Sequence, residues 1–157
     1  MRDIAATRER LAGEIVPVRA EQSSTKDDNE EKFGAHRAID LDLSTRSSAS
    51  SGADGSIWFK VNIGQVSCVD QIMLYTKDGD RSLTWTCSKT DCSTCEGKWC
   101  ASFSLTVYRE GAVDNVPSVS GCKYGDTVKL QLIVSNILYV QEISITEKKG
   151  EIIFIRR

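Results

Sequence analysis

The stretch "IWFKVNIG", residues 57–64, alternates between apolar and polar side chains. In an extended strand the two sets lie on opposite faces, with Phe59, Val61 and Ile63 on one and Trp58, Lys60 and Asn62 on the other. An apolar face of this kind must be covered by a second layer of structure. The stretch therefore predicts a central strand of a layered β protein.

Other segments show the same period of two. Pro17 in the first of them indicates an edge strand. The segments are "IVPVRAEQSS" (15–24), "CVDQIMLYT" (68–76), "SFSLTVYRE" (102–110), "VKLQLIVS" (128–135, with Val128, Leu130, Leu132 and Val134 on one face), "ILYVQEISITEK" (137–148) and "EIIFIRR" (151–157). Residues 50–157 contain no sustained helical stripe. The pattern predicts an all-β sandwich or barrel.

The chain length and composition are those of one globular domain. The 157 residues are 40% hydrophobic and 27% charged, with a net charge of -2. This charge does not favour nucleic acid or an anionic membrane surface as a partner, and no segment reaches the roughly 20 apolar residues of a membrane span. We expect residues 1–14 to be an arm or linker and residues 15–157 the domain, with 25–34 a charged loop and 44–56 a long surface loop. The polar N-terminus is unlike a signal peptide, so one has been removed or the chain is a fragment.

Six cysteines indicate an exported protein. Four of them are Cys87, Cys92, Cys95 and Cys100, in the spacing C-x4-C-x2-C-x4-C. Zinc sites pair two C-x2-C knuckles across a longer spacer, and no second knuckle exists here. We expect disulfides, with zinc or reduced thiols as alternatives, and a third pair between Cys68 and Cys122. The four clustered cysteines allow three pairings, and the sequence does not choose among them.

The chain offers little for catalysis. It has one histidine, and no serine or cysteine stands in a recognisable nucleophile motif. The one pair of carboxylates that stands out is Asp40 and Asp42, in "AIDLDLSTRS" (38–47), where Ser44, Thr45 and Ser47 follow. Two aspartates at i and i+2 in a turn repel each other unless a positive charge offsets them, and oxygen ligands suit calcium. We predict a non-enzymatic protein with a metal site at this turn; an exposed acidic turn is the alternative.

Four motifs in order resemble the discoidin, or coagulation-factor C-type, superfamily. They are "AEQSST" (20–25), "AHRAIDLDLSTRS" (35–47), "WFKVNIGQVSCVDQIMLYT" (58–76) and "ILYVQEISI" (137–145). Within that superfamily the chain looks most like the fucolectins, or F-type lectins, and the resemblance covers about residues 15–147. It implies an eight-stranded jelly-roll β-sandwich of the galactose-binding-domain type, here with a disulfide-rich loop insert. The ligand site of such a domain is built by loops at one end.

The resemblance also implies a calcium ion beside the acidic turn. Carried over by position, the ligands are the Arg37 carbonyl, Asp40, Asp42, a hydroxyl or carbonyl at Ser51, the Gln141 carbonyl and Glu142. The glycine that the family has between its two turn positions is replaced by Leu41. Calcium takes six to eight oxygen ligands, which such a set can supply.

Fucolectins bind sugar through a histidine and two basic side chains. The corresponding loop here is "YTKDGDRSLTW" (75–85), with the candidates Lys77, Asp78, Asp80 and Arg81. The histidine has no counterpart, and His36 is expected at the surface or packed in a loop. Trp85 and Trp99 flank the cysteine cluster and are further candidates, because an exposed tryptophan can stack on a sugar ring. The alternative is that both tryptophans pack against the disulfides, and Trp58 is expected to be structural.

The leading hypothesis is a secreted or cell-surface, calcium-stabilised carbohydrate-binding module. Its partner is then a glycan or glycoprotein, bound through loops at one end of the sandwich, with several copies or a longer multidomain chain giving avidity. The alternative is an extracellular adhesion or recognition domain that binds a protein, for example at a cell surface, or a lipid surface, and has lost sugar binding. A lipid-binding domain would expose Leu83 and Trp85 at loop tips.

Overall fold

The computed structural model describes residues 9–10, 12–42, 44–51, 55–77, 80–87, 94–97, 100–110, 118–119, 121–133 and 138–148. At residues 77, 80–82 and 118–119 it describes the backbone alone.

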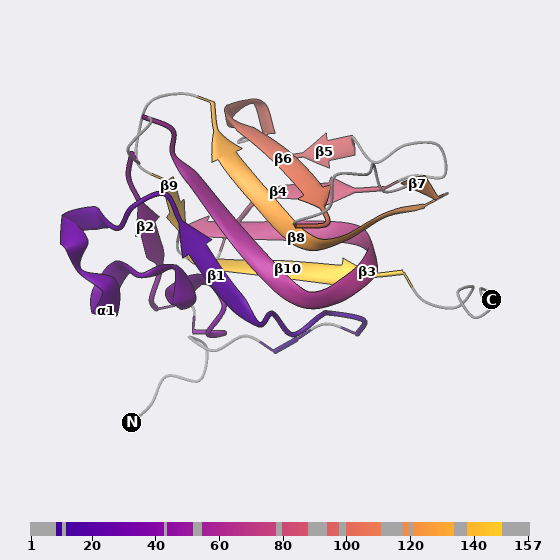
Figure 1. Cartoon of the computed structure of the whole chain (residues 1–157), viewed down its shortest axis with the longest axis horizontal. Coiled ribbons are helices and arrows are strands. Elements are labelled where there is room, and N and C mark those ends of the chain that lie inside the picture. Colours follow the sequence, from indigo (N-terminus) through magenta and orange to yellow (C-terminus); the bar gives the residue numbers. More distant parts are fainter. Residues whose placement is uncertain are drawn as a thin grey trace.

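One long strand, β3 (Trp58–Lys77), organises both layers of the fold. Its first half pairs with β1 (Arg19–Gln22) and β8 (Cys122–Leu132), and its second half pairs with β10 (Glu142–Glu147) and β4 (Asp80–Thr86). The sequence predicted two separate strands here, at 57–64 and 68–76. The structure joins them in one strand that curls from one layer into the other (Figure 1). The register against β8 shifts between Asn62 and Ser67, and Gly64 there has φ +88°, which favours glycine.

The remaining strands complete an antiparallel sandwich. The larger sheet runs β5 (Thr94–Glu96), β4, β3, β8, β6 (Phe103–Tyr108), and β7 (Ser118–Val119) pairs with β8. A second sheet consists of β2 (Ser47–Ala49) and β9 (Leu138–Val140). Short helical segments occupy Lys26–Asp28 (η2), Glu30–Phe33 (α1), Ala35–Ala38 (η3) and Cys100–Ser102 (η4). The prediction of an all-β sandwich is confirmed. None of the helices in the described ranges has the length or the apolar run that a bilayer-spanning helix requires.

The core lies between the two layers and comes from alternate positions of three strands. Its members are almost completely buried: Phe59, Val61, Ile63, Ile72 and Leu74 of β3, Val128 and Leu130 of β8, and Ile143 and Ile145 of β10. The predicted inward face of residues 57–64 is therefore correct, and Trp58, Lys60 and Asn62 are only partly buried on the outer face. Burial of this apolar surface is the main driving force for folding, at roughly 25 cal/mol per Å².

Two expected loops contain ordered elements. Residues 44–56 were predicted to form a surface loop. This prediction is wrong for β2, because Ser47, Ser48 and Ala49 are completely buried. Their small side chains allow β2 to pack closely inside the fold while it pairs with β9. The expected charged loop at 25–34 contains η2 and α1, with most of its charged side chains exposed. The backbone of Glu14 forms an isolated antiparallel β-bridge with that of Thr146 in β10. The domain boundary expected between residues 14 and 15 remains a prediction.

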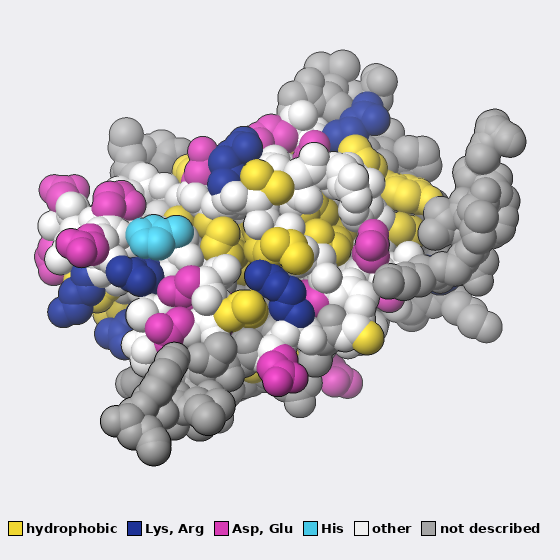
Figure 2. Space-filling view, turned by 90° about the horizontal axis from the view of Figure 1, so that it is seen from below, with side chains coloured by type: hydrophobic (Ala, Val, Ile, Leu, Met, Phe, Trp, Pro, Cys, Tyr) yellow, Lys and Arg dark blue, Asp and Glu magenta, His cyan; other side chains and the backbone are white. Residues whose placement is uncertain are grey.

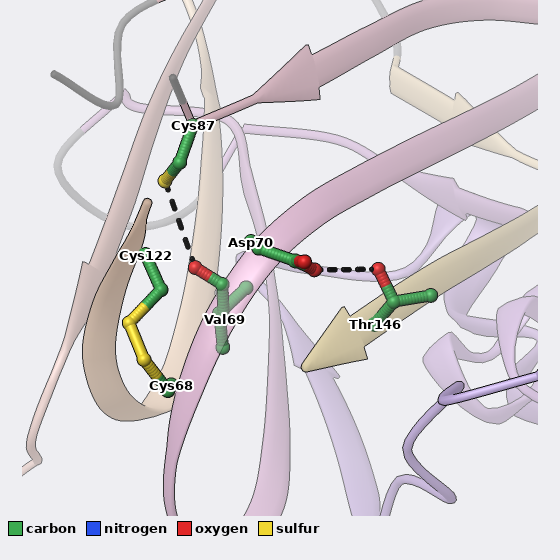
Figure 3. Close-up of a disulfide and its surroundings, with 6 residues drawn as sticks. All are labelled: Cys68, Val69, Asp70, Cys87, Cys122 and Thr146. Atoms are coloured by element: carbon green, nitrogen blue, oxygen red, sulfur yellow. Dashed lines mark hydrogen bonds between the residues drawn. A yellow bond between two sulfur atoms is a disulfide. The ribbon is translucent and has the colours of Figure 1, made fainter. Parts of the chain in front are cut away.

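The described cysteines are all in disulfides. The predicted bond between Cys68 and Cys122 is confirmed and links β3 to β8, and Cys95 is bonded to Cys100. Cys87 is also disulfide-bonded, whereas Cys92 lies outside the described residues. Figure 3 shows the sulfur of Cys87 beside the first of these bonds, 3.6 Å from the carbonyl oxygen of Val69. Thiolates of these five residues are thus not available to hold zinc.

Gly125 of β8 lies against the backbone of β6. A Cβ atom at this position would meet the Tyr108 oxygen at 2.6 Å and the Tyr108 nitrogen at 2.8 Å. Gly125→Ala is therefore expected to lower the free energy of unfolding by about 2 kcal/mol, because the two strands must separate. Urea unfolding measures this loss. Ser104→Ala, at an exposed position of β6, is the control and should change stability by less than about 0.5 kcal/mol. Equal stability of the two variants would contradict the close approach.

Candidate functional site

The acidic turn after η3 is held by its own side chains. Asp40 Oδ1 accepts the backbone N–H of Asp42 at 2.9 Å, and Asp42 Oδ1 accepts the backbone N–H of Ser44 at 2.9 Å. The Ser44 hydroxyl also donates to Asp42 Oδ1 at 2.6 Å. Leu41 has φ +62°, a conformation that side chains rarely adopt, at the position where the resembled family has glycine. The aspartates therefore fold the chain into two consecutive side-chain-stabilised turns.

Glu142 connects this turn to the last strand. It begins β10, is completely buried, and its Oε2 accepts the backbone N–H of Leu41 at 2.7 Å. The two residues are 101 positions apart in the chain. Burial of a carboxylate is costly unless it is hydrogen-bonded or faces positive charge. The preceding residue, Gln141, is also buried and donates its N–H to the Tyr75 carbonyl at 2.7 Å.

Thr45 contributes a hydroxyl that the ligand set carried over from the family did not include. Its Oγ1 donates to Asp40 Oδ2 at 2.8 Å and lies 3.2 Å from the Asp42 carbonyl oxygen. The signal was present in the sequence, because Thr45 lies three residues after Asp42 in the same turn. Ser51, the residue selected instead, has its carbonyl bonded to the Ser24 hydroxyl at 2.9 Å.

Arg37 supplies positive charge beside the turn. Its Nη1 lies 3.8 Å from Asp40 Oδ2, while Nε and Nη2 both donate to the Glu31 carbonyl, at 2.8 and 2.6 Å. The sequence analysis assigned a role only to the Arg37 carbonyl. The guanidinium thus offsets part of the negative charge that Asp40 and Asp42 bring together.

The acidic turn offers oxygen atoms as possible ligands of a cation. Among the described residues, no three Asp, Glu, His or Cys side chains are placed to hold a metal ion by themselves. A cation would also need neutral oxygen atoms, which is the usual composition of a calcium site. The turn offers the Asp40 carboxylate, the Asp42 carbonyl and the Thr45 hydroxyl, and the Glu142 carboxylate meets it at Leu41. Every one of these donors is an oxygen atom.

The sugar-binding candidates from the sequence are only partly described. Lys77 and Asp80 pair where β3 turns into β4, and with Arg81 they are described by their backbone alone. Asp78 and Trp99 lie outside the described residues. His36 is exposed, as expected.

Trp85 and Leu83 of β4 lie inside the fold. Trp85 is 7% exposed and Leu83 is 3% exposed, and both belong to the hydrophobic core. Trp85 therefore agrees with the packing alternative and not with an exposed sugar platform. The lipid-binding alternative, which required both side chains at loop tips, is wrong in this respect, because their strand positions direct them into the sandwich.

A second group of charges lies on the outer face of the sheet. Lys60 contacts Glu110 at 2.8 Å and Glu21 at 3.3 Å, and the hydrogen bond to Glu110 is the main reason that the pKa of Lys60 is raised. Burial raises the pKa of Tyr108 nearby. The ring of Trp58 is flanked by the ammonium groups of Lys60 and Lys129, at 5.3 and 5.4 Å from its centroid. Carboxylates neutralise Lys60, whereas within the described residues Lys129 forms no ion pair and lies over the ring.

Comparison with known proteins relates the chain to others by fold. No protein-family model and no curated protein matches it. The F5/8 type C domain of a Bacteroides fragilis protein aligns with a TM-score of 0.55 at 15% identity, over 84% of this chain and 92% of that domain. The family 32 carbohydrate-binding module of NanJ from C. perfringens, in complex with galactose, aligns with a TM-score of 0.56 at 13% identity, over 85% and 98%. The corresponding module of AlyQ, in complex with 4,5-unsaturated mannuronic acid, gives 0.55 at 16%, over 86% and 98%.

At these identities the likeness concerns the fold. The chain has a β-sandwich fold like that of these F5/8 type C and carbohydrate-binding domains, as the motif order predicted. The likeness extends across this wider group and does not single out the fucolectins.

Proposed function

We propose that the chain is a non-catalytic carbohydrate-binding module, stabilised by calcium, that binds glycans through loops at one end of the sandwich. The observation that carries the proposal is the hydrogen bond from Leu41 to the buried Glu142, which fixes the acidic turn to the last strand. A loop fixed in this way can present ligand-binding groups without a large loss of conformational entropy on binding.

The fold supports a sugar as the ligand. Two of the similar structures are carbohydrate-binding modules in complex with galactose and with 4,5-unsaturated mannuronic acid. A fucolectin-like preference for fucose is a finer hypothesis, and the sequence lacks the histidine that this preference uses. The disulfides support a secreted or extracellular location, because such bonds persist in oxidising compartments.

Side chains of the chain itself hold the acidic turn in its conformation. Asp40 and Asp42 shape it, Thr45 orients the Asp40 carboxylate, and Glu142 anchors Leu41. A calcium ion held by Asp40, the Asp42 carbonyl, Thr45 and Glu142 would neutralise the carboxylates and make the turn more rigid. The ion would shape the loops without touching the sugar.

Calcium is expected to raise the thermal stability of the purified protein. A ligand that binds only the native state adds roughly 2.7 kcal/mol at a hundredfold excess over its Kd. For a domain of this size that corresponds to a Tm increase of roughly 5–10 °C. Thermal unfolding with excess calcium and with a chelator measures the difference.

The controls separate a site from a general salt effect. Asp40→Ala should abolish the calcium-dependent shift, because it removes a carboxylate of the turn. Glu31→Ala, on the exposed face of α1, should retain the full shift, because only the Glu31 carbonyl contacts Arg37. The absence of any shift in a sample first stripped of metal would refute the calcium part of the proposal.

Sugar binding is tested by affinity electrophoresis and a glycan array with neutral and acidic glycans. We expect retardation by at least one class, at the weak affinity usual for a single site. Binding to none of them would refute the carbohydrate proposal and favour the alternative of a protein-recognition domain.

A further inference from the structure

Three cations and two aromatic rings alternate at the α1 end of the sandwich. The Lys26 ammonium lies 5.1 Å from the centroid of the Phe33 ring and 6.0 Å from that of Tyr139. Lys32 lies 5.2 Å from the Phe33 centroid, and the Arg46 guanidinium 4.8 Å from the Tyr139 centroid. These contacts form a continuous row, which we call the cation–ring row. Its order is Lys32, Phe33, Lys26, Tyr139 and Arg46.

The row is assembled from distant parts of the chain. Lys26 belongs to η2, Lys32 and Phe33 to α1, Arg46 directly precedes β2, and Tyr139 lies in β9. Phe33, Tyr139 and Lys26 are partly exposed, and Lys32 and Arg46 are exposed. The row is thus a surface feature at the end where the acidic turn also lies.

The three cations of the row have no ion pair within the described residues, although acidic residues surround Lys26 and Lys32 in the sequence. One of those carboxylates, Glu30, accepts the Thr25 hydroxyl at 2.5 Å instead. Figure 2 shows basic side chains at the end that carries α1, with acidic side chains close beside them. Within the described residues, the cations of the row thus contact ring faces and form no ion pair with a carboxylate of the chain.

The turn that presents Lys26 has a left-handed backbone. Asp27 and Asp28 both have φ +55°, a conformation that aspartate adopts more readily than most residues other than glycine. These two residues complete η2, and its first residue, Lys26, reaches both rings.

We propose that the cation–ring row binds an acidic glycan, one that carries carboxylate or sulfate groups. This inference rests on the proposed carbohydrate-binding function and names its substrate class. The rings hold the ammonium and guanidinium groups in place, and these groups form charge-assisted hydrogen bonds to carboxylate or sulfate oxygens. Successive charged sugars of one oligomer would meet successive cations of the row.

Two matched pairs of ligands test the proposal by titration of the full chain. The first pair is a short oligomer of galacturonic acid and its methyl ester, and the second is dextran sulfate and dextran. We expect the chain to bind the charged member of one or both pairs, with an affinity about tenfold or more above that for the neutral member. The two pairs distinguish carboxylate from sulfate. Raising NaCl from about 0.05 to about 0.5 M should weaken this binding, because exposed charges are screened.

Variants locate the binding on the surface. Lys26→Gln and Arg46→Gln should each weaken acidic-glycan binding about tenfold, because each removes one cation of the row. Lys129→Gln is the matched control, because Lys129 also lies over an aromatic ring but belongs to the outer face of the sheet. It should bind like the unchanged protein, and urea unfolding of all three variants reports whether the fold is intact.

The outcomes separate the inference from the function on which it rests. Equal binding of charged and neutral members, or equal losses in Lys26→Gln and Lys129→Gln, would overturn the inference while leaving a carbohydrate-binding module. Binding of an acidic peptide in place of both acidic glycans would overturn the inference and favour a protein partner. Failure of both pairs would overturn the inference alone, and binding of no glycan in the array as well would also remove the proposed function.

Discussion

Replacing Cys68 and Cys122 together with serine is expected to lower the free energy of unfolding by about 4 kcal/mol. The bond joins residues 54 positions apart, and the entropy that a cross-link removes from the unfolded chain grows with the logarithm of the loop that it closes. The bond also joins β3 to β8 (Figure 3), in the part of β3 that follows the register shift against β8. A loss of this size is a large part of the stability of an ordinary domain.

Urea unfolding of the double variant measures the loss. The matched control is Cys95→Ser with Cys100→Ser, which opens a bond between residues only 5 positions apart. Loop closure predicts a loss of about 2 kcal/mol for this second variant. Equal losses in the two variants, or a larger loss in the second, would show that native-state contacts and not chain entropy dominate these bonds.

The strands and their buried faces could be predicted from local patterns. Phe59, Val61 and Ile63 alternate with polar residues, and this alternation alone fixes which side of β3 faces the core. The continuity of β3 could not be predicted in this way. Gly64 and its exposed neighbours interrupt the alternation and resemble a turn, whereas the chain makes a bulge and continues as the same strand. Such a bulge depends on the register of β8, which is a non-local property.

Buried polar elements were missed for a similar reason. Ser47 and Ser48 of β2 have no apolar pattern, and a run of serines and glycines is typical of a loop. Their burial depends on the partner strand β9, 93 residues away at the Ser47 hydrogen bond. For Trp85 the sequence left exposure and packing as alternatives, and its position in β4 directs it into the core.

The candidate site was predictable only in part. The resemblance brought the acidic turn and Glu142 into one hypothesis, and the structure places Glu142 against Leu41 of that turn. The cation–ring row had no signal in the sequence, because its members lie between residues 26 and 139 without a common spacing. Contacts between side chains of distant segments arise from the fold, and a single sequence does not encode them as a pattern.

Removal of the Glu142 side chain is expected to be nearly as costly as removal of the long-range disulfide. Glu142→Ala should lower the free energy of unfolding by about 3 kcal/mol, because it leaves the Leu41 N–H without its charged acceptor and creates a cavity. Urea unfolding with a constant m-value measures the change. Glu147→Ala at the partly exposed end of the same strand is the control, with an expected change below about 0.5 kcal/mol.

Glu142→Gln separates the charge of this side chain from its shape. Glutamine can still accept the Leu41 N–H, so in chelator the variant should be as stable as the unchanged protein or more stable, because burying a charge is costly. In excess calcium the order should reverse, since the amide lacks the charge that attracts the ion. A variant that is less stable by the same amount in both conditions would show that Glu142 interacts with fixed positive groups of the protein. The calcium proposal would then fail at its central carboxylate, while the anchoring of Leu41 would remain.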